Sequence, residues 1–229
     1  MKKNLSIKTL AIIVLPSLVA INTQSAQNPM NGYPRPKPVA AQLTMQNSAA
    51  NKTLFQAIQQ GDKRTVSALI KEGNVNVNAM SKKGTPLIAA AKQAAKNPTM
   101  DSQMASIVKI LLKSDANPSL TGPKGMTALM WAAKGGANKT AKALLPDKNI
   151  REQTINMEDD QGNSALYFAS KEGNDSTVSL LLSYKEIRPT QMAIMKAKFQ
   201  NIKNKIQDKM DKLVKEGKIQ VKRVQEKYF

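Results

Sequence analysis

The sequence predicts an all-α fold in which pairs of helices stack into a solenoid, followed by a long amphipathic helix at the C-terminus. Four segments align on a leucine that is followed three residues later by an alanine. Aromatic residues make up only 4% of the 229 residues, which favours closely packed helices over an aromatic-rich β-sandwich. The aligned leucines are Leu54, Leu87, Leu129 and Leu166, and the alanines are Ala57, Ala90, Ala132 and Ala169.

The composition limits the chemistry of the chain. Its length allows one domain of ordinary size with tails, and its hydrophobic content of 41% is sufficient for a packed core. The absence of cysteine and histidine excludes disulfides, thiolate nucleophiles, Cys/His zinc sites and histidine-based acid–base catalysis. We therefore predict a protein that is not an enzyme and that uses no cofactor, metal ion or small-molecule substrate.

The formal net charge of +19 favours an anionic partner, with the lysine-rich composition that an AT-rich genome encodes by default as the alternative explanation. Only five of the 35 basic residues are arginine, although the planar guanidinium is the group best suited to bidentate phosphate binding. This composition argues against nucleic acid. An acidic protein remains the main candidate, with an anionic membrane surface as an alternative.

Residues 1–26 have the layout of a secretory signal peptide. Lys2, Lys3 and Lys8 form a basic start, and the apolar run from Leu10 to Ile21 is too short to span a bilayer comfortably. We predict export to the periplasm or out of the cell, with an uncleaved membrane anchor as the alternative. Residues 27–50 follow as a linker, because four prolines there favour an extended, polyproline-like backbone: Pro29, Pro34, Pro36 and Pro38.

The similarity among the four segments extends beyond the leucine and the alanine. The aligned leucines are 33, 42 and 37 residues apart. We assign nine extra residues to AKNPTMDSQ and its neighbours and four to the region around NIREQTINME, because insertions in turns preserve the helical register. A second apolar stripe follows in each segment: Val66, Leu69 and Ile70; Val108, Leu111 and Leu112; Ala141, Leu144 and Leu145; Val178, Leu181 and Leu182.

The residue types at the ends of the first helices also recur. Thr85, Thr127 and Ser164 lie where a hydroxyl caps free backbone N–H groups, and Pro86 suits a first helical turn. Three glycines are placed to end the first helix in the left-handed conformation: Gly61, Gly136 and Gly173.

The segments GTPLIAAA (84–91), GMTALMWAA (125–133) and GNSALYFAS (162–170), with the 33-residue period, resemble the ankyrin repeat. The resemblance implies four repeats over about residues 51–184, at about 51–82, 83–122, 123–159 and 160–184, with short β-turn fingers between the helical pairs. The chain departs from the family pattern where Phe55, Ile88, Met130 and Tyr167 replace the usual histidine, and where Lys52 replaces the threonine of the first repeat.

The same resemblance implies a protein partner that binds the concave face and the finger tips. The turn positions implied are Ser81, Lys82, Lys124, Met126, Asp160, Gln161 and Asn163, and the helix positions are Lys92, Lys134, Lys171 and Glu172. Trp131 and Phe168 occupy one equivalent slot of the third and fourth repeats. They are expected mainly to pack within the array, with a role as binding anchors as the alternative.

Two other motifs invite a functional interpretation. GGANKT (135–140) lacks the glycine before the lysine and the preceding strand that a phosphate loop requires, so we interpret it as a turn between helices. EDDQGN (158–163) lacks the alternating oxygen ligands of a calcium loop. Asp159 and Gly162 within it are expected to form a solvated β-turn.

The segment 185–229 is basic, with thirteen basic and five acidic residues. Apolar residues recur there at three- and four-residue steps, and Gly217 follows as a stop. We expect a helix that caps the last repeat, with a coiled-coil partner or an anionic membrane surface as alternatives. The apolar residues are Met192, Met195, Phe199, Ile202, Ile206 and Leu213.

The sequence as a whole predicts a non-enzymatic protein–protein interaction module that binds an acidic protein. The alternative function is binding to an envelope surface, anionic lipid or nucleic acid through the basic C-terminal helix.

Overall fold

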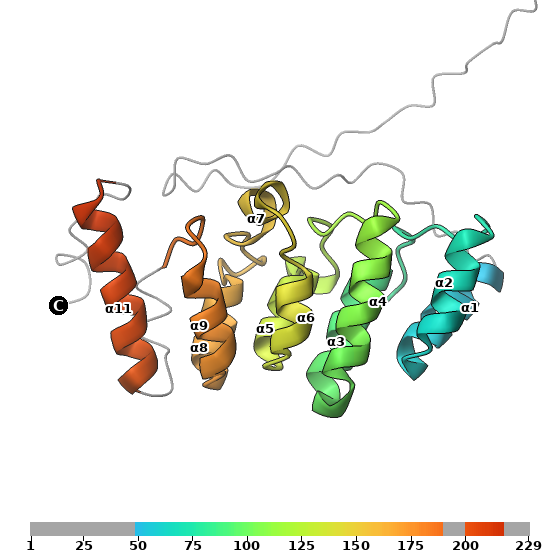
Figure 1. The fold of residues 1–229 in the computed structure, drawn as a ribbon, viewed down its shortest axis with the longest axis horizontal. Coiled ribbons are helices and arrows are strands. Elements are labelled where there is room, and N and C mark those ends of the chain that lie inside the picture. Colours follow the sequence, from blue (N-terminus) through green and yellow to red (C-terminus); the bar gives the residue numbers. More distant parts are fainter. Residues whose placement is uncertain (1–48, 190–199, 218–229) are drawn as a thin grey trace, which may run out of the picture. The chain divides into compact units, whose positions relative to one another are not determined.

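The computed structural model describes residues 49–189 and 200–217, and within these ranges the helices form stacked pairs (Figure 1). The first helices of the pairs pack on one another in sequence order, and so do the second helices. The described ranges contain no strand longer than an isolated bridge, which confirms the all-α solenoid. The pairs are α1 (Ala49–Gln60) with α2 (Lys63–Lys71), α3 (Pro86–Lys96) with α4 (Asp101–Lys113), α5 (Ala128–Lys134) with α6 (Asn138–Ala143), and α8 (Ala165–Glu172) with α9 (Asp175–Ser183).

The core lies between these helices, at the positions that the alignment singles out. The four aligned leucines are at most 3% exposed, and so are the four aligned alanines. The alanines allow each first helix to approach the next, while the second-helix stripe contributes further buried residues to the same cluster, including Val66, Val108, Ala141 and Val178. No single pair encloses its apolar face, so the pairs are stable only as a stack.

The helix ends follow the predicted pattern. The hydroxyl of Thr85 accepts a hydrogen bond from the N–H of Ile88, and Thr127 and Ser164 cap α5 and α8 in the same way. The glycines after α1, α5 and α8 have φ values of +73°, +67° and +78°, which confirms their left-handed conformation. Sequence reasoning missed the Asp62 carboxylate, which caps α2 by accepting from the N–H groups of Arg64 and Thr65.

Short turns connect each pair to the next. Antiparallel bridges join Ser81 to Gly84 and Glu158 to Ser164, and the N–H of Gly122 donates to the carbonyl of Met126 across the turn between them in sequence. These turns correspond to the β-turn fingers that the repeat pattern implies.

The two insertions take different forms. In the second segment the extra residues lengthen α3 and α4 on either side of a short 3-10 turn, η1 (Pro98–Met100). The insertion between the third and fourth segments was expected to be a turn, but it contains a helix, α7 (Lys148–Thr154). Arg151 of α7 pairs with Glu186 at 3.2 Å, so this helix is held against the segment that follows α9.

Hydrogen bonds between neighbouring repeats stabilise the stack. The Asp101 carboxylate accepts from the N–H groups of Lys139 and Thr140 at the start of α6. The Asn174 side chain donates to the carbonyls of Ala133 and Lys134 at the end of α5. The neighbouring repeat thus supplies additional hydrogen-bond partners to the ends of these helices.

Helix α11 (Gln200–Lys215) packs against α9. Ile202, Ile206 and Leu213 are buried, and Lys205 pairs with Asp175 at 2.7 Å. These contacts match the capping interpretation of this segment. None of the described helices is long and apolar enough to cross a membrane.

Several predictions concern residues outside the described ranges. The signal peptide (1–26) is among them, as are Met192, Met195 and Phe199 of the C-terminal segment. Most of the linker also lies outside, but Ala49 and Ala50 form the first turn of α1, so the helical array begins slightly earlier than expected.

Candidate protein-interaction surface

Three lysines occupy the same register position on three successive first helices. Lys92, Lys134 and Lys171, here called the lysine stripe, each follow the aligned leucine by five residues, on α3, α5 and α8. Lys134 and Lys171 are exposed and Lys92 is half-buried. Because α3, α5 and α8 pack in sequence order, the stacking of the repeats aligns these lysines in one row, although they are far apart in the sequence.

Trp131 lies between two members of the lysine stripe. The ammonium group of Lys92 is 4.5 Å from the centroid of the indole ring and that of Lys134 is 5.5 Å from it, distances typical of cation–π contacts. Trp131 is partly buried, as expected of a residue that packs within the array, but it retains an accessible portion. Its Nε1 is buried without an acceptor among the described residues.

Phe168 differs from its counterpart in the third repeat. It is only 8% exposed and belongs to the core, so it offers a partner little surface, and the packing interpretation is the one that fits. Tyr167, one residue earlier, is partly exposed. Its ring lies 5.4 Å from that of Phe168 in an edge-on arrangement, with Lys171 5.9 Å away.

Tyr167 was not among the residues expected to bind a partner. Tyr167 takes the place of the usual histidine of the repeat, and this position was the sequence feature that could have singled it out. It does not predict exposure, however, because Ile88 and Met130 at the same position of other repeats are fully buried. Only the packing of α8 distinguishes it from them.

The turn residues are a mixed set. Lys82, Lys124, Asp160 and Gln161 are exposed, as a contact surface requires, whereas Met126 is 4% exposed and packs in the core. Met126 therefore cannot contribute a substantial contact without rearrangement. The turns of the third and fourth repeats touch, because the N–H of Asp160 donates to the carbonyl of Lys124.

Ser81 and Asn163 are partly committed to the turns themselves. The Ser81 hydroxyl donates to the carbonyl of Gly84, and the Asn163 side chain donates to the Asp159 carboxylate. Glu172 is exposed beside Lys171 at the end of α8. The structure thus brings the helix positions together more completely than the turn positions.

The electrostatics of the lysine stripe are unbalanced. Among the described residues, none of its three ammonium groups has a carboxylate at ion-pair distance. Burial lowers the pKa of Lys92 below its ordinary value, and the neighbouring charges of Lys96 and Lys83 lower it further. A carboxylate placed beside these ammonium groups would relieve this repulsion.

Neither of the two motifs is a ligand-binding loop. Residues 135–137 of GGANKT form the expected turn between α5 and α6, but Asn138, Lys139 and Thr140 already belong to the first turn of α6. In EDDQGN, Asp159 accepts from the N–H groups of Gln161 and Asn163, and Gly162 has a φ of +78°. The β-turn is as expected, but Asp159 was expected to be solvated and is instead 5% exposed, because its carboxylate holds the turn together from inside. No group of potential ligands for a metal ion occurs in residues 49–189 and 200–217.

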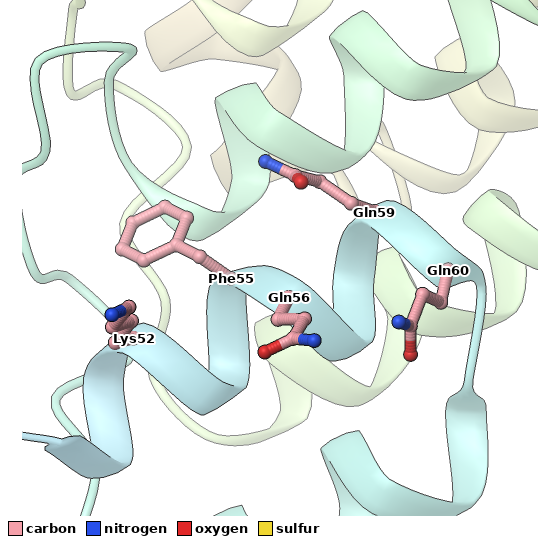
Figure 2. Close-up of a pocket in the computed structure, with 5 residues that line it drawn as sticks. All are labelled: Lys52, Phe55, Gln56, Gln59 and Gln60. Atoms are coloured by element: carbon pink, nitrogen blue, oxygen red, sulfur yellow. The ribbon is translucent and has the colours of Figure 1, made fainter.

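A shallow hollow of about 430 Å³ lies on the outer face of α1, where no earlier helical pair is described. Figure 2 shows the side chains that line it, from successive turns of one helix. Amides predominate and no titratable pair converges there, so the hollow lacks the chemistry of a catalytic site. Its lining residues are Lys52, Phe55, Gln56, Gln59 and Gln60.

Comparisons with known proteins agree with this architecture. Residues 92–193 match the sequence profile of the family described as ankyrin repeats (3 copies). Over 126 residues, or 54% of its length, the chain is 31% identical to Rabankyrin-5 from Homo sapiens, of which it spans 10%. Residues 92–193 therefore carry ankyrin repeats, and the four helical pairs stacked in register have the architecture that this family match implies.

Proposed function

We propose that the ankyrin array is a non-enzymatic interaction module that binds an acidic protein along the lysine stripe and the adjoining turns. The observation that carries this proposal is the row formed by Lys92, Lys134 and Lys171 over Trp131 and Tyr167, with no carboxylate partner in the described ranges. Exposed Lys82 and Lys124 extend the positive charge onto the turns.

The rigidity of this surface supports the proposal. The helices that carry the lysine stripe are joined by a continuous core and by inter-repeat hydrogen bonds such as those of Asn174. A preformed surface needs little ordering when a partner binds, so more of the interaction energy appears as affinity.

Charge reversal tests the surface. We expect the triple variant Lys92→Glu, Lys134→Glu and Lys171→Glu, immobilised as the full chain, to lose the acidic proteins that the unmodified chain retains at low salt. The matched control is Lys109→Glu, Lys113→Glu and Lys142→Glu, which changes the net charge equally on the exposed faces of α4 and α6. It should retain the same proteins. Circular dichroism verifies that both variants are folded.

Salt provides a second check on the same experiment. Attraction between exposed charges is screened over roughly 10 Å at about 0.1 M salt, so retention should fall steeply between about 50 and 200 mM. Retention of the same proteins by the stripe variant, or equal losses in both variants, would refute the assignment of the surface.

The described part of the C-terminal segment favours a structural role over the alternative function. A membrane-surface helix needs a free apolar face, but Ile202 and Ile206 of α11 are fully buried in the core. Lys205 and Lys209 are also engaged, with Asp175 and with the carbonyl of Tyr184. We therefore place the partner-binding function on the lysine stripe rather than on this helix.

We further propose that the protein is exported, on the evidence of the basic start and the apolar run within residues 1–26. Expression of the full chain in a bacterium is expected to yield a periplasmic or secreted form that lacks about the first 25 residues. Intact-mass measurement of each cell fraction tests this. Recovery of only the full-length mass from the cytoplasm would contradict it.

A further inference from the structure

The lysine stripe has a spacing that a ligand must match. Lys92 Nζ and Lys134 Nζ lie 4.5 Å and 5.5 Å from the same Trp131 centroid, so the two nitrogens are no further apart than the sum of these distances, about 10 Å. Stacked helices lie roughly 8–10 Å apart, and the stripe has one lysine per repeat. The helix spacing, rather than this upper limit, sets the interval between equivalent lysines at roughly 8–10 Å, and a ligand that pairs with them one by one must present acidic groups at about that interval.

A polyproline helix has this interval. It has three residues per turn and rises roughly 3.1 Å per residue, so every third side chain lies on one face at intervals of about 9 Å. A β-strand repeats on one face at about 6.6 Å, which is shorter than the roughly 8–10 Å between stacked helices, so its carboxylates would fall out of step with the lysines along the stripe. An α-helix reaches about 10.5 Å at every seventh residue, so distance alone leaves it as the competing ligand.

The aromatic residues distinguish the polyproline ligand from the α-helix. Trp131 and Tyr167 are both partly exposed and lie beside the ammonium groups of the stripe. Exposed aromatic side chains are the groups on which proline-rich segments dock in the extended polyproline conformation, which loses little entropy on binding. The indole Nε1 of Trp131 lacks an acceptor among the described residues.

We propose that the partner presents an extended acidic segment in the polyproline conformation, with an acidic residue at every third position. The carboxylates pair with Lys92, Lys134 and Lys171, while intervening prolines pack on Trp131 and Tyr167. This proposal rests on the proposed function of the same surface and adds the conformation and spacing of what it binds. The proline-rich segment of the chain itself carries Arg35 and Lys37, so it lacks the charge of this ligand.

Three synthetic peptides test the spacing on the full chain. The first has glutamate at every third position and proline between. The second has the same composition with its glutamates consecutive, and the third has the same number of glutamates at every seventh position of an alanine-rich helix. Trp131 is the sole tryptophan, so its fluorescence reports binding at this site, and calorimetry gives the affinity. We expect the first peptide to bind at least about tenfold more tightly than the other two at the same salt concentration, with a saturable change in Trp131 emission.

The stripe variant separates the possible failures. If the first two peptides bind equally and the triple charge reversal abolishes both, the surface binds acidic ligands and the spacing proposal is wrong. Tighter binding of the third peptide also overturns it, in favour of a helical partner. If no peptide binds, or if charge reversal leaves binding unchanged, the proposed function itself fails.

Discussion

Replacing Leu87 with alanine is expected to lower the free energy of unfolding by about 4 kcal/mol, the largest effect of any substitution considered. Deleting a buried leucine side chain removes its transfer free energy and leaves a cavity, which together cost about 2–5 kcal/mol. Leu87 is 1% exposed and lies on α3, which packs against α1, α4 and α5. A cavity there weakens several inter-helix contacts at once. Equilibrium unfolding in urea, followed by circular dichroism, measures the loss.

The matched control is Leu112→Ala on α4 of the same repeat. Leu112 is only partly buried, so its truncation removes less buried apolar area than that of Leu87, and water can fill the space that is left. The expected loss in the free energy of unfolding is about 1 kcal/mol. Similar losses in the two variants would mean that the aligned leucine is not a special position. The alignment of the repeats on these leucines would then no longer be explained by their burial in the core.

Gly135→Ala is expected to destabilise the protein by about 3 kcal/mol, at the upper end of the usual cost of overpacking. A Cβ at this position would overlap with both the Cα and the Cβ of Ala95 and would lie 2.9 Å from its carbonyl oxygen. The obstacle includes backbone of α3, so α3 and α5 would have to separate. Residue 135 has a φ of −89°, which alanine adopts without strain, so the loss would be purely steric. Thermal and urea unfolding give its size.

Gly73→Ala separates this steric effect from the general cost of losing a glycine. Gly73 has a φ of +73° but nothing within 4 Å of an added Cβ, so only backbone strain of about 1 kcal/mol is expected. A loss at Gly73 as large as that at Gly135 would show that backbone conformation, rather than the close approach of α3 and α5, governs these positions.

The repeat pattern predicted the architecture because each of its signals is local. The caps at Thr85, Thr127 and Ser164 involve residues three apart in sequence, and the left-handed glycines follow directly from where each helix ends. The apolar stripes follow from helical periodicity, so the burial of the aligned leucines could be inferred without knowing what they touch.

Features that join separate repeats escaped prediction. The Asp101 carboxylate reaches α6 across nearly 40 residues of sequence, and Gly135 is defined by Ala95 of the previous repeat. Helix α7 also escaped, because NIREQTINME lacks a clear apolar period and is held by a long-range ion pair, Arg151 to Glu186. In each case the deciding partner is far away in the chain.

The candidate surface also has features that the local sequence predicts and features that only packing between repeats decides. From sequence alone, Lys92, Lys134 and Lys171 could be assigned to one register position, because repetition makes equivalent residues recognisable. Exposure was decided by packing, which buries Met126 and Phe168 and leaves Tyr167 partly accessible. Side-chain exposure depends on the neighbouring repeat, and a repeat sequence specifies its neighbours only once the repeats have stacked.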